Sequence, residues 1–383
     1  MFWIIKPKLA WKVSRPQWQQ TNHGQRVSAV IGGHLIWFES SDIALTPAPE
    51  AFAQVMLIPA LHQRRRLKID SPLDAAWLAN VEKVTKVFSS WWDYPASIPI
   101  DGASANNVAR PHLPKRPEGC IAQMGPDPIV GRNAALCFSG GIDSFFSLLR
   151  GSAQFDNLIF VHGFDIRLDD ATRMQAMAST LCQVASATGK RLIIVRTNLR
   201  EHPLFRSTPW ERTHGAALAA IGHLLAPEIR QLEIAASWPY PERYRWGSHW
   251  EIDPLWSASR TCIVGEITSD TRWDKLAALG GHPLVQQHLH VCWKNQTPTG
   301  NCSRCEKCVR TMVMLDATGH LNGSRVFAPA EPLADLLDAL RTAPPHTTAQ
   351  WLRVAGRVHS ADVKHAIERL VYRSHAAISR KAI

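Results

Sequence analysis

The segment that most constrains this chain is Cys137-Phe138-Ser139-Gly140-Gly141-Ile142-Asp143-Ser144. The apolar run 134–138 predicts a buried strand, and 144–152 predicts a helix. A strand that turns through glycines into a helix directs several backbone N–H groups at one place, at the positive end of the helix dipole, where they bind phosphate. The hydroxyls of Ser139 and Ser144 add donors, whereas Asp143 requires a compensating Mg²⁺ or backbone N–H. No lysine follows, so this is not the GxxxxGK[ST] loop.

A second motif lies far downstream, where four cysteines have the spacing C-x9-C-x2-C-x2-C. They are Cys292, Cys302, Cys305 and Cys308. This spacing predicts a closed tetrahedral Zn²⁺ site whose role is structural, because no coordination position is left open. An iron–sulfur cluster, which also takes four cysteines, is the alternative. Disulfides fit the short spacing poorly.

Together the two motifs resemble the 7-cyano-7-deazaguanine synthases among the PP-loop ATP pyrophosphatases, whose loop reads S-G-G-x-D-S. The resemblance covers about 134–318 and is firm at the two motifs. It implies that ATP is cleaved between its α- and β-phosphates, that a carboxylate or amide oxygen is adenylated, and that ammonia or an amine then displaces AMP. It also implies that the four cysteines hold Zn²⁺ and that Mg-ATP binds the loop, formed by Ser139, Gly140, Gly141, Ile142, Asp143 and Ser144.

The first hundred-odd residues have no counterpart in these synthases, so the resemblance implies a relative with a different acceptor. A small molecule or a modified-base-like compound is the expected acceptor, and an RNA or protein acceptor is the less favoured one. Sulfur insertion through Cys120 is a second possible activity. A catalytically silent nucleotide-binding adaptor is a third possibility.

The central region alternates strands and helices, which predicts an α/β fold with a doubly wound parallel sheet of the PP-loop type. The further predicted strands are 158–163, 191–196 and 232–237, and the further predicted helices are 170–188 and 213–225. Four regions are expected: an N-terminal α+β domain at 1–110, a Pro-rich linker at 111–132, the ATP pyrophosphatase domain at 133–325 and a helical appendage at 326–383. Within them we expect a hairpin at Gly32-Gly33 and helices at 41–61, 74–87, 331–340 and 360–379.

Ligands of such sheets bind at the carboxyl ends of the strands, which singles out further site residues. Asp165 follows the second strand and is expected either to contact adenosine or to cap a helix. His214 and Gly215 are expected to open a helix and receive an anion. Arg272 and Lys275 are expected to assist catalysis by binding pyrophosphate or a carboxylate. The expected substrate contacts are Trp238, Ser248, His249 and Asp253.

The formal net charge of +11 invites a nucleic-acid partner, but the basic residues are scattered apart from the run Arg64-Arg65-Arg66. We therefore favour a solvated surface with sites for the phosphates of ATP. No apolar run is long enough for a membrane span, and the start shows no signal-peptide pattern. The cysteines outside the metal motif are expected to be free, in keeping with a cytoplasmic protein; they are Cys120, Cys137, Cys182 and Cys262.

Overall fold

The computed structural model describes residues 10–102, 133–329 and 331–379. The described chain divides into two compact units. Unit 1 comprises 10–102, 133–138, 147–169 and 188–269. Unit 2 comprises 139–146, 170–187, 270–329 and 331–379.

Unit 1 is built on a large mixed sheet that is mostly parallel, so the predicted α/β class is confirmed. Five strands pair in parallel in the spatial order β11-β10-β7-β8-β9. They are β7 (Ala134–Cys137), β8 (Asn157–His162), β9 (Arg191–Thr197), β10 (Gln231–Ile234) and β11 (Cys262–Gly265). Chain order reverses between β7 and β10, which makes their carboxyl ends the switch point where ligands of open α/β sheets bind.

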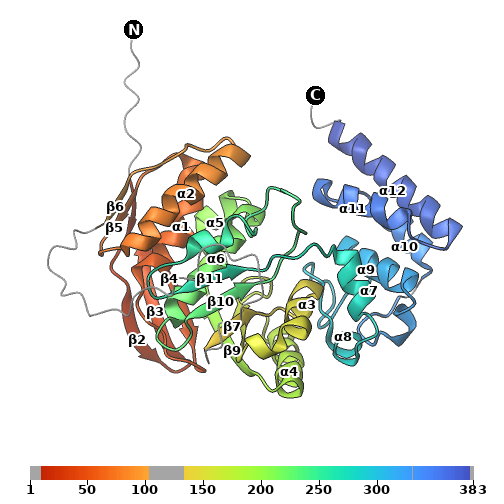
Figure 1. The fold of residues 1–383 in the computed structure, drawn as a ribbon, viewed down its shortest axis with the longest axis horizontal. Coiled ribbons are helices and arrows are strands. Elements are labelled where there is room, and N and C mark those ends of the chain that lie inside the picture. The colour runs from red at the N-terminus through yellow and green to blue at the C-terminus, as the bar shows by residue number, and fades with distance from the viewer. Residues whose placement is uncertain (1–9, 103–132, 330, 380–383) are drawn as a thin grey trace, which may run out of the picture. The chain divides into compact units, whose positions relative to one another are not determined.

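The N-terminal strands continue the same sheet, because β4 pairs antiparallel with β9 (Figure 1). They are β1 (Trp11–Val13), β2 (Gln17–Thr21), β3 (Gly24–Ile31), β4 (His34–Ser40), β5 (Leu67–Ile69) and β6 (Ile100–Gly102). The predicted hairpin at Gly32-Gly33 is confirmed, since Ile31 pairs with His34 across the turn. Both glycines have positive φ, 55° and 89°, as a two-residue hairpin turn of this hand requires.

Helices α1 (Pro49–Gln63) and α6 (Trp210–Leu225) pack together in the core of unit 1. Helix α1 begins at Pro49, later than the 41–61 pattern predicts, because Pro47 disfavours the helical conformation before it and Pro49 suits a first helical position. The other helices of unit 1 are α2 (Ala75–Trp91), α5 (Pro203–Ser207), η1 (Ser152–Gln154), η2 (Leu199–Glu201) and η3 (Asp253–Trp256). Helix α2 confirms the predicted helix at 74–87.

Unit 2 is helical apart from its loops. It holds the first turns of α3 (Ile142–Arg150) and nearly all of α4 (Ala171–Thr188). Its later elements are α7 (Arg272–Leu279), α8 (Pro283–His288), α9 (Glu306–Ala317), η4 (Leu321–Gly323), α10 (Leu333–Ala339), α11 (Pro345–Ala355) and α12 (Ala361–Ser379). Helices α10 and α12 confirm the two predicted C-terminal helices, and α11 between them was not predicted. Among the described helices, none is long and apolar enough to cross a membrane.

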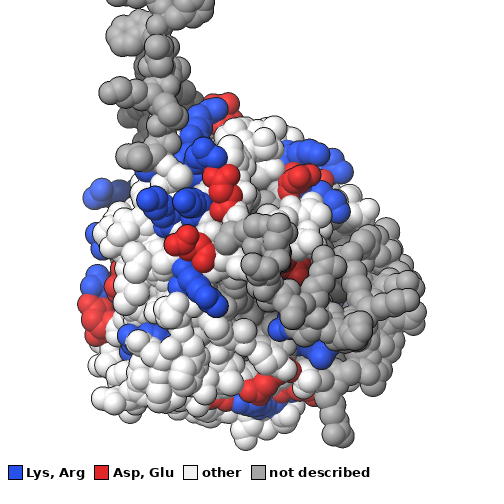
Figure 2. Space-filling view, turned by 90° about the vertical axis from the view of Figure 1, so that its left-hand side faces the viewer, with Lys and Arg blue, Asp and Glu red and all other residues white. Residues whose placement is uncertain are grey.

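Charge on the face shown in Figure 2 is mixed, with Lys and Arg interspersed among Asp and Glu. The basic run is engaged by its own chain. Arg64 pairs with Asp93 at 2.9 Å, and Arg66 pairs with Asp101 at 2.8 Å. The Arg65 guanidinium lies 4.0 Å from the centre of the Trp11 ring. Each arginine of the most compact cationic stretch in the sequence therefore has a partner within the chain.

Candidate active site

The glycine loop joins β7 to α3 and is fixed by its backbone. Gly140 has φ of +73°, a conformation that favours glycine, and its carbonyl accepts a hydrogen bond from the backbone N–H of His290 at 2.8 Å. The Ser144 hydroxyl donates to the carbonyl of Gly141 at 3.0 Å, while Ser139 is exposed. The first N–H groups of a helix have no partner within the helix, so the start of α3 offers donors to an anion.

Asp143, in the first turn of α3, meets two cations from α7. Its carboxylate lies 2.6 Å from the Arg272 guanidinium and 3.4 Å from the Lys275 ammonium. Burial raises the pKa of Asp143, but the attraction of Arg272 and Lys275 outweighs it and holds that pKa well below its usual range. The loop therefore keeps a charged carboxylate, and the cation that the sequence requires is supplied by the chain itself.

A capping box stabilises the N-terminus of helix α7, which carries Arg272 and Lys275. Thr271 and Asp274 form a capping box, in which the Thr271 side chain accepts from the Asp274 N–H and Asp274 accepts from the Thr271 N–H. Lys275 is 1% exposed and lies 5.2 Å from the centre of the Phe146 ring. The Nε of Arg272 is buried without a hydrogen-bond partner among the described residues, so this guanidinium retains a donor.

The four cysteines converge as their spacing predicts. Their sulfur atoms lie within 4.8 Å of one another, and all four residues are buried. The Cys292–Cys305 and Cys302–Cys308 sulfur pairs are 4.0 and 3.9 Å apart. Zn–S bonds of about 2.3 Å in a tetrahedron place sulfurs about 3.8 Å apart, so this donor set fits a metal such as zinc. The N–H of Cys305 also donates to the Cys302 sulfur at 3.2 Å.

A buried polar chain, which sequence reasoning missed, runs from the four-cysteine cluster toward α11. The Glu306 carboxylate, next to Cys305, accepts from Arg310 at 2.9 Å and from the Trp351 indole at 2.8 Å. Arg310 also donates to Gln350. Burial lowers the pKa of Arg272, but Asp143 and Glu306 raise it above its usual value. Only the Glu306–Arg310 spacing of four residues on a helix gave a sequence signal.

The predicted substrate residues all lie in unit 1. Trp238 stacks on Tyr244 with ring centres 4.0 Å apart, and the Trp246 ring lies 5.5 Å from that of His214. The Nε1 of Trp238 is buried and has no hydrogen-bond partner within the described part of the chain. We call the rings of Trp238, Tyr244, Trp246 and His214 the aromatic wall.

Ser248 and His249 lie in the loop before η3, and Asp253 is the first residue of η3. The Ser248 hydroxyl donates to Asp253 at 2.8 Å, and a His249 ring nitrogen lies 3.3 Å from the Glu242 carbonyl. Burial raises the pKa of Asp253 to about 7 and lowers the pKa of His249. The other carboxylate oxygen of Asp253 is buried without a partner among the described residues.

The expectation that His214 and Gly215 open a helix is wrong. Helix α6 begins at Trp210, so both residues lie past its first turn, where backbone N–H groups bond within the helix. Gly215 serves packing instead, because a Cβ there would lie 2.0 Å from the carbonyl oxygen of Gly247. Burial lowers the pKa of His214, which favours its neutral form. Asp165 is exposed in the segment after β8.

The remaining cysteines differ from expectation at one position. Cys137 and Cys182 are free, but Cys262 is disulfide-bonded, so its assignment as a free cysteine is wrong. Burial raises the pKa of Cys137 far above its usual value. Cys120 lies outside the described residues.

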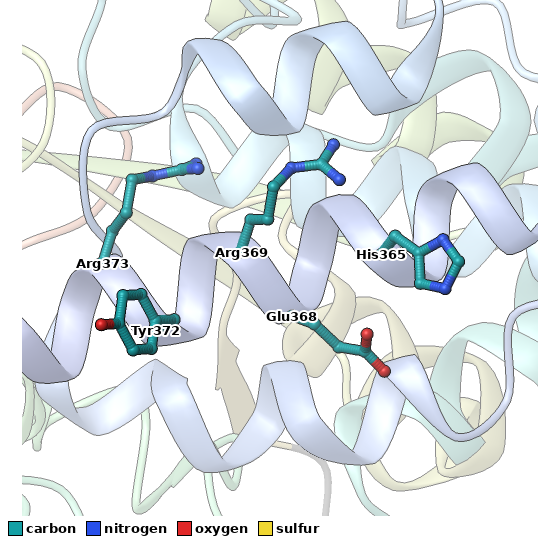
Figure 3. A pocket seen from close by; sticks show the side chains of 5 residues that line it. All are labelled: His365, Glu368, Arg369, Tyr372 and Arg373. Carbon is teal, nitrogen blue, oxygen red and sulfur yellow. The ribbon is translucent and has the colours of Figure 1, made fainter.

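A surface hollow of about 670 Å³ lies along α12, apart from every predicted site residue. Figure 3 shows that its five lining side chains all project from this one helix. They are His365, Glu368, Arg369, Tyr372 and Arg373.

No protein-family model matches the chain, and a search of curated proteins found no match.

Proposed function

We propose that the protein is an ATP pyrophosphatase of the PP-loop type that adenylates an acceptor and then joins it to ammonia or an amine. The observation that carries this proposal is the glycine loop at the start of α3, whose Asp143 is clasped by Arg272 and Lys275. Loop N–H groups, hydroxyls and two cations gathered around one loop suit a polyphosphate whose charge grows as pyrophosphate leaves.

In the proposed reaction, the phosphates of ATP accept hydrogen bonds from the loop backbone and from the Ser139 hydroxyl, while the Ser144 hydroxyl stabilises the loop by donating to the Gly141 carbonyl. Arg272 and Lys275 offset the charge of the departing pyrophosphate. Mg²⁺ bound to ATP would neutralise part of the charge of its phosphates. An acceptor oxygen attacks the α-phosphorus, and the nitrogen nucleophile then displaces AMP from the adenylate.

We propose that the aromatic side chains of unit 1 bind the acceptor. Trp238, with its unpaired indole N–H, is suited to a planar molecule that carries a hydrogen-bond acceptor. Ser248, His249 and Asp253 then stabilise the loop that borders this wall. The four-cysteine centre holds zinc and stabilises unit 2 without taking part in the chemistry.

The test is nucleotide product analysis of the purified protein with Mg-ATP, ammonium and a small-molecule cell extract. We expect AMP and pyrophosphate in equal amounts. We expect Asp143→Asn to reduce their formation by at least about 100-fold, because it removes the carboxylate from the loop. Asp316→Asn, an exposed acid on α9, is the matched control and is expected to retain the activity.

Formation of ADP and phosphate, or ATP binding without turnover, would contradict the proposal and favour the silent adaptor. Sulfur insertion predicts that the activity depends on Cys120. A thiolated product that forms with the wild type but not with Cys120→Ser would show that a cysteine persulfide, and not ammonia, is the donor.

A further inference from the structure

The backbone of the glycine loop rests on the segment that leads into the metal centre. The N–H of His290 donates to the carbonyl of Gly140 at 2.8 Å, and a Cβ on Gly140 would lie 3.6 Å from that of His290. Leu289 and Val291, on either side, are 1% and 4% exposed. A displacement of this segment therefore carries the loop with it.

A single amide side chain clamps this segment. The Asn301 Oδ1 accepts from the backbone N–H groups of Val291 and Cys292 at 2.8 and 3.1 Å. Its Nδ2 donates to the carbonyls of Leu289 and Val326 at 2.8 and 3.3 Å. All four hydrogen-bonding positions of the amide are used, which no other side chain of this length reproduces.

We propose that Asn301 is a positioning residue that couples the four-cysteine centre to the glycine loop. Asn301 precedes the ligand Cys302, and the segment that it clamps ends at the ligand Cys292. The metal and the amide thus tie the same two stretches of chain together, and His290 stands two residues before Cys292. The inference rests on the proposed function only for the identity of the loop's ligand, ATP.

The test is Asn301→Ala in the full-length, zinc-loaded protein without nucleotide. Hydrogen–deuterium exchange is measured for peptides that cover 139–146 and 288–291. We expect exchange in both to accelerate about tenfold or more, as the local opening free energy falls, with peptides from α10 and α12 unchanged. Zinc content is expected to stay at the wild-type value, because all four ligands remain.

The affinity for α,β-methylene ATP gives a second readout, and we expect it to fall about tenfold as the loop loses its ordered form. If the wild-type protein does not bind this analogue, the proposed function fails while the exchange measurement still tests the clamp.

Ser303→Ala is the matched control. Ser303 lies in the same turn, and its hydroxyl accepts from the N–H of Ala328 at 3.0 Å; among the described residues it makes no bond to the clamped segment. We expect wild-type exchange in 139–146 for this variant. Asn301→Asp keeps one acceptor oxygen but sets a second carboxylate oxygen against the carbonyls of Leu289 and Val326, so its exchange is also expected to accelerate.

Wild-type exchange of 139–146 in Asn301→Ala, at wild-type zinc content, would overturn the inference. Should that variant not fold, wild-type exchange in Asn301→Asp would do the same.

Discussion

Asp143 and Glu233 are both largely buried carboxyl groups, and their neighbours drive their pKa values in opposite directions. At Asp143 the desolvation is outweighed by Arg272 and Lys275, so the carboxylate stays charged. At Glu233, burial, with a smaller contribution from Glu266, raises the pKa to about 8. The two residues show that the partner of a buried acid decides its charge.

The raised pKa of Glu233 makes the stability of unit 1 pH-dependent. The unfolded chain releases this proton near pH 4.3, whereas the folded chain keeps it to about pH 8. The folded state therefore binds more protons across this window, and its stability falls as pH rises from about 5 to 8. We expect urea midpoints to fall from pH 5.5 to 8 in the wild type, by less in Glu233→Gln.

The control for this prediction is Glu228→Gln, because the Glu228 side chain is 45% exposed. It should retain the wild-type slope. An equal slope in Glu233→Gln would show that another group dominates the pH dependence.

At the scale of elements, the contact between β4 and β9 joins the N-terminal strands to the parallel half of the sheet. The register pairs only Phe38 with Thr197 and Glu39 with Arg196. Glu39 is fully buried and binds two guanidinium groups, Arg26 at 2.9 Å and Arg196 at 2.8 Å. A short strand pairing is thus reinforced by a buried ionic clasp.

Removing the Glu39 carboxylate leaves two partly buried arginines without their shared partner. We expect Glu39→Ala to lower the free energy of unfolding by about 3–5 kcal/mol, measured by urea denaturation. Asp338→Ala is the matched control, since Asp338 also binds two arginines, Arg369 and Arg373, but is 38% exposed. It is expected to cost less than about 1 kcal/mol. Similar losses in both variants would refute the buried clasp.

At the scale of the molecule, the two units have different sources of stability. Unit 1 has a continuous sheet and an apolar core. In unit 2, three of the four cysteines, Cys292, Cys302 and Cys305, lie in turns and loops before α9. We infer that a metal stabilises this segment, as in small metal-stabilised domains.

We expect the purified protein to carry about one zinc per chain and to lack the visible absorbance of an iron–sulfur cluster. Chelation is expected to open unit 2 to proteolysis at 289–308 while the strands of unit 1 stay protected. Metal analysis, absorbance and mass spectrometry of the fragments measure this. A brown, iron-containing protein would show that the cysteines hold the alternative iron–sulfur cluster. An unchanged proteolytic digest after metal removal would contradict a structural role for the metal.

The motifs that the sequence predicts correctly are local. The strand, the glycines and the helix around 134–150 follow from neighbouring residues, and the four cysteines approach one another because short spacings permit little else. The start of helix α6 was predicted wrongly because the sequence offers two possible start signals. Thr213 resembles a helix cap, but Trp210 and the residues after it already follow the helical pattern. The fifth parallel strand, Cys262–Gly265, was not predicted, because its apolar run is only three residues long before Gly265 interrupts it.

The sequence by itself determined the glycine loop, the cysteine set and the alternation of strands and helices, since each depends on residues close together in the chain. Only the tertiary structure decided the partners: Arg272 and Lys275 reach Asp143 across 129 and 132 residues. It also decided that β4 extends the parallel sheet and that Asn301 ties the cysteine turn to the segment beneath the loop. Such contacts depend on how packed elements bring distant side chains together, and no local pattern encodes that arrangement.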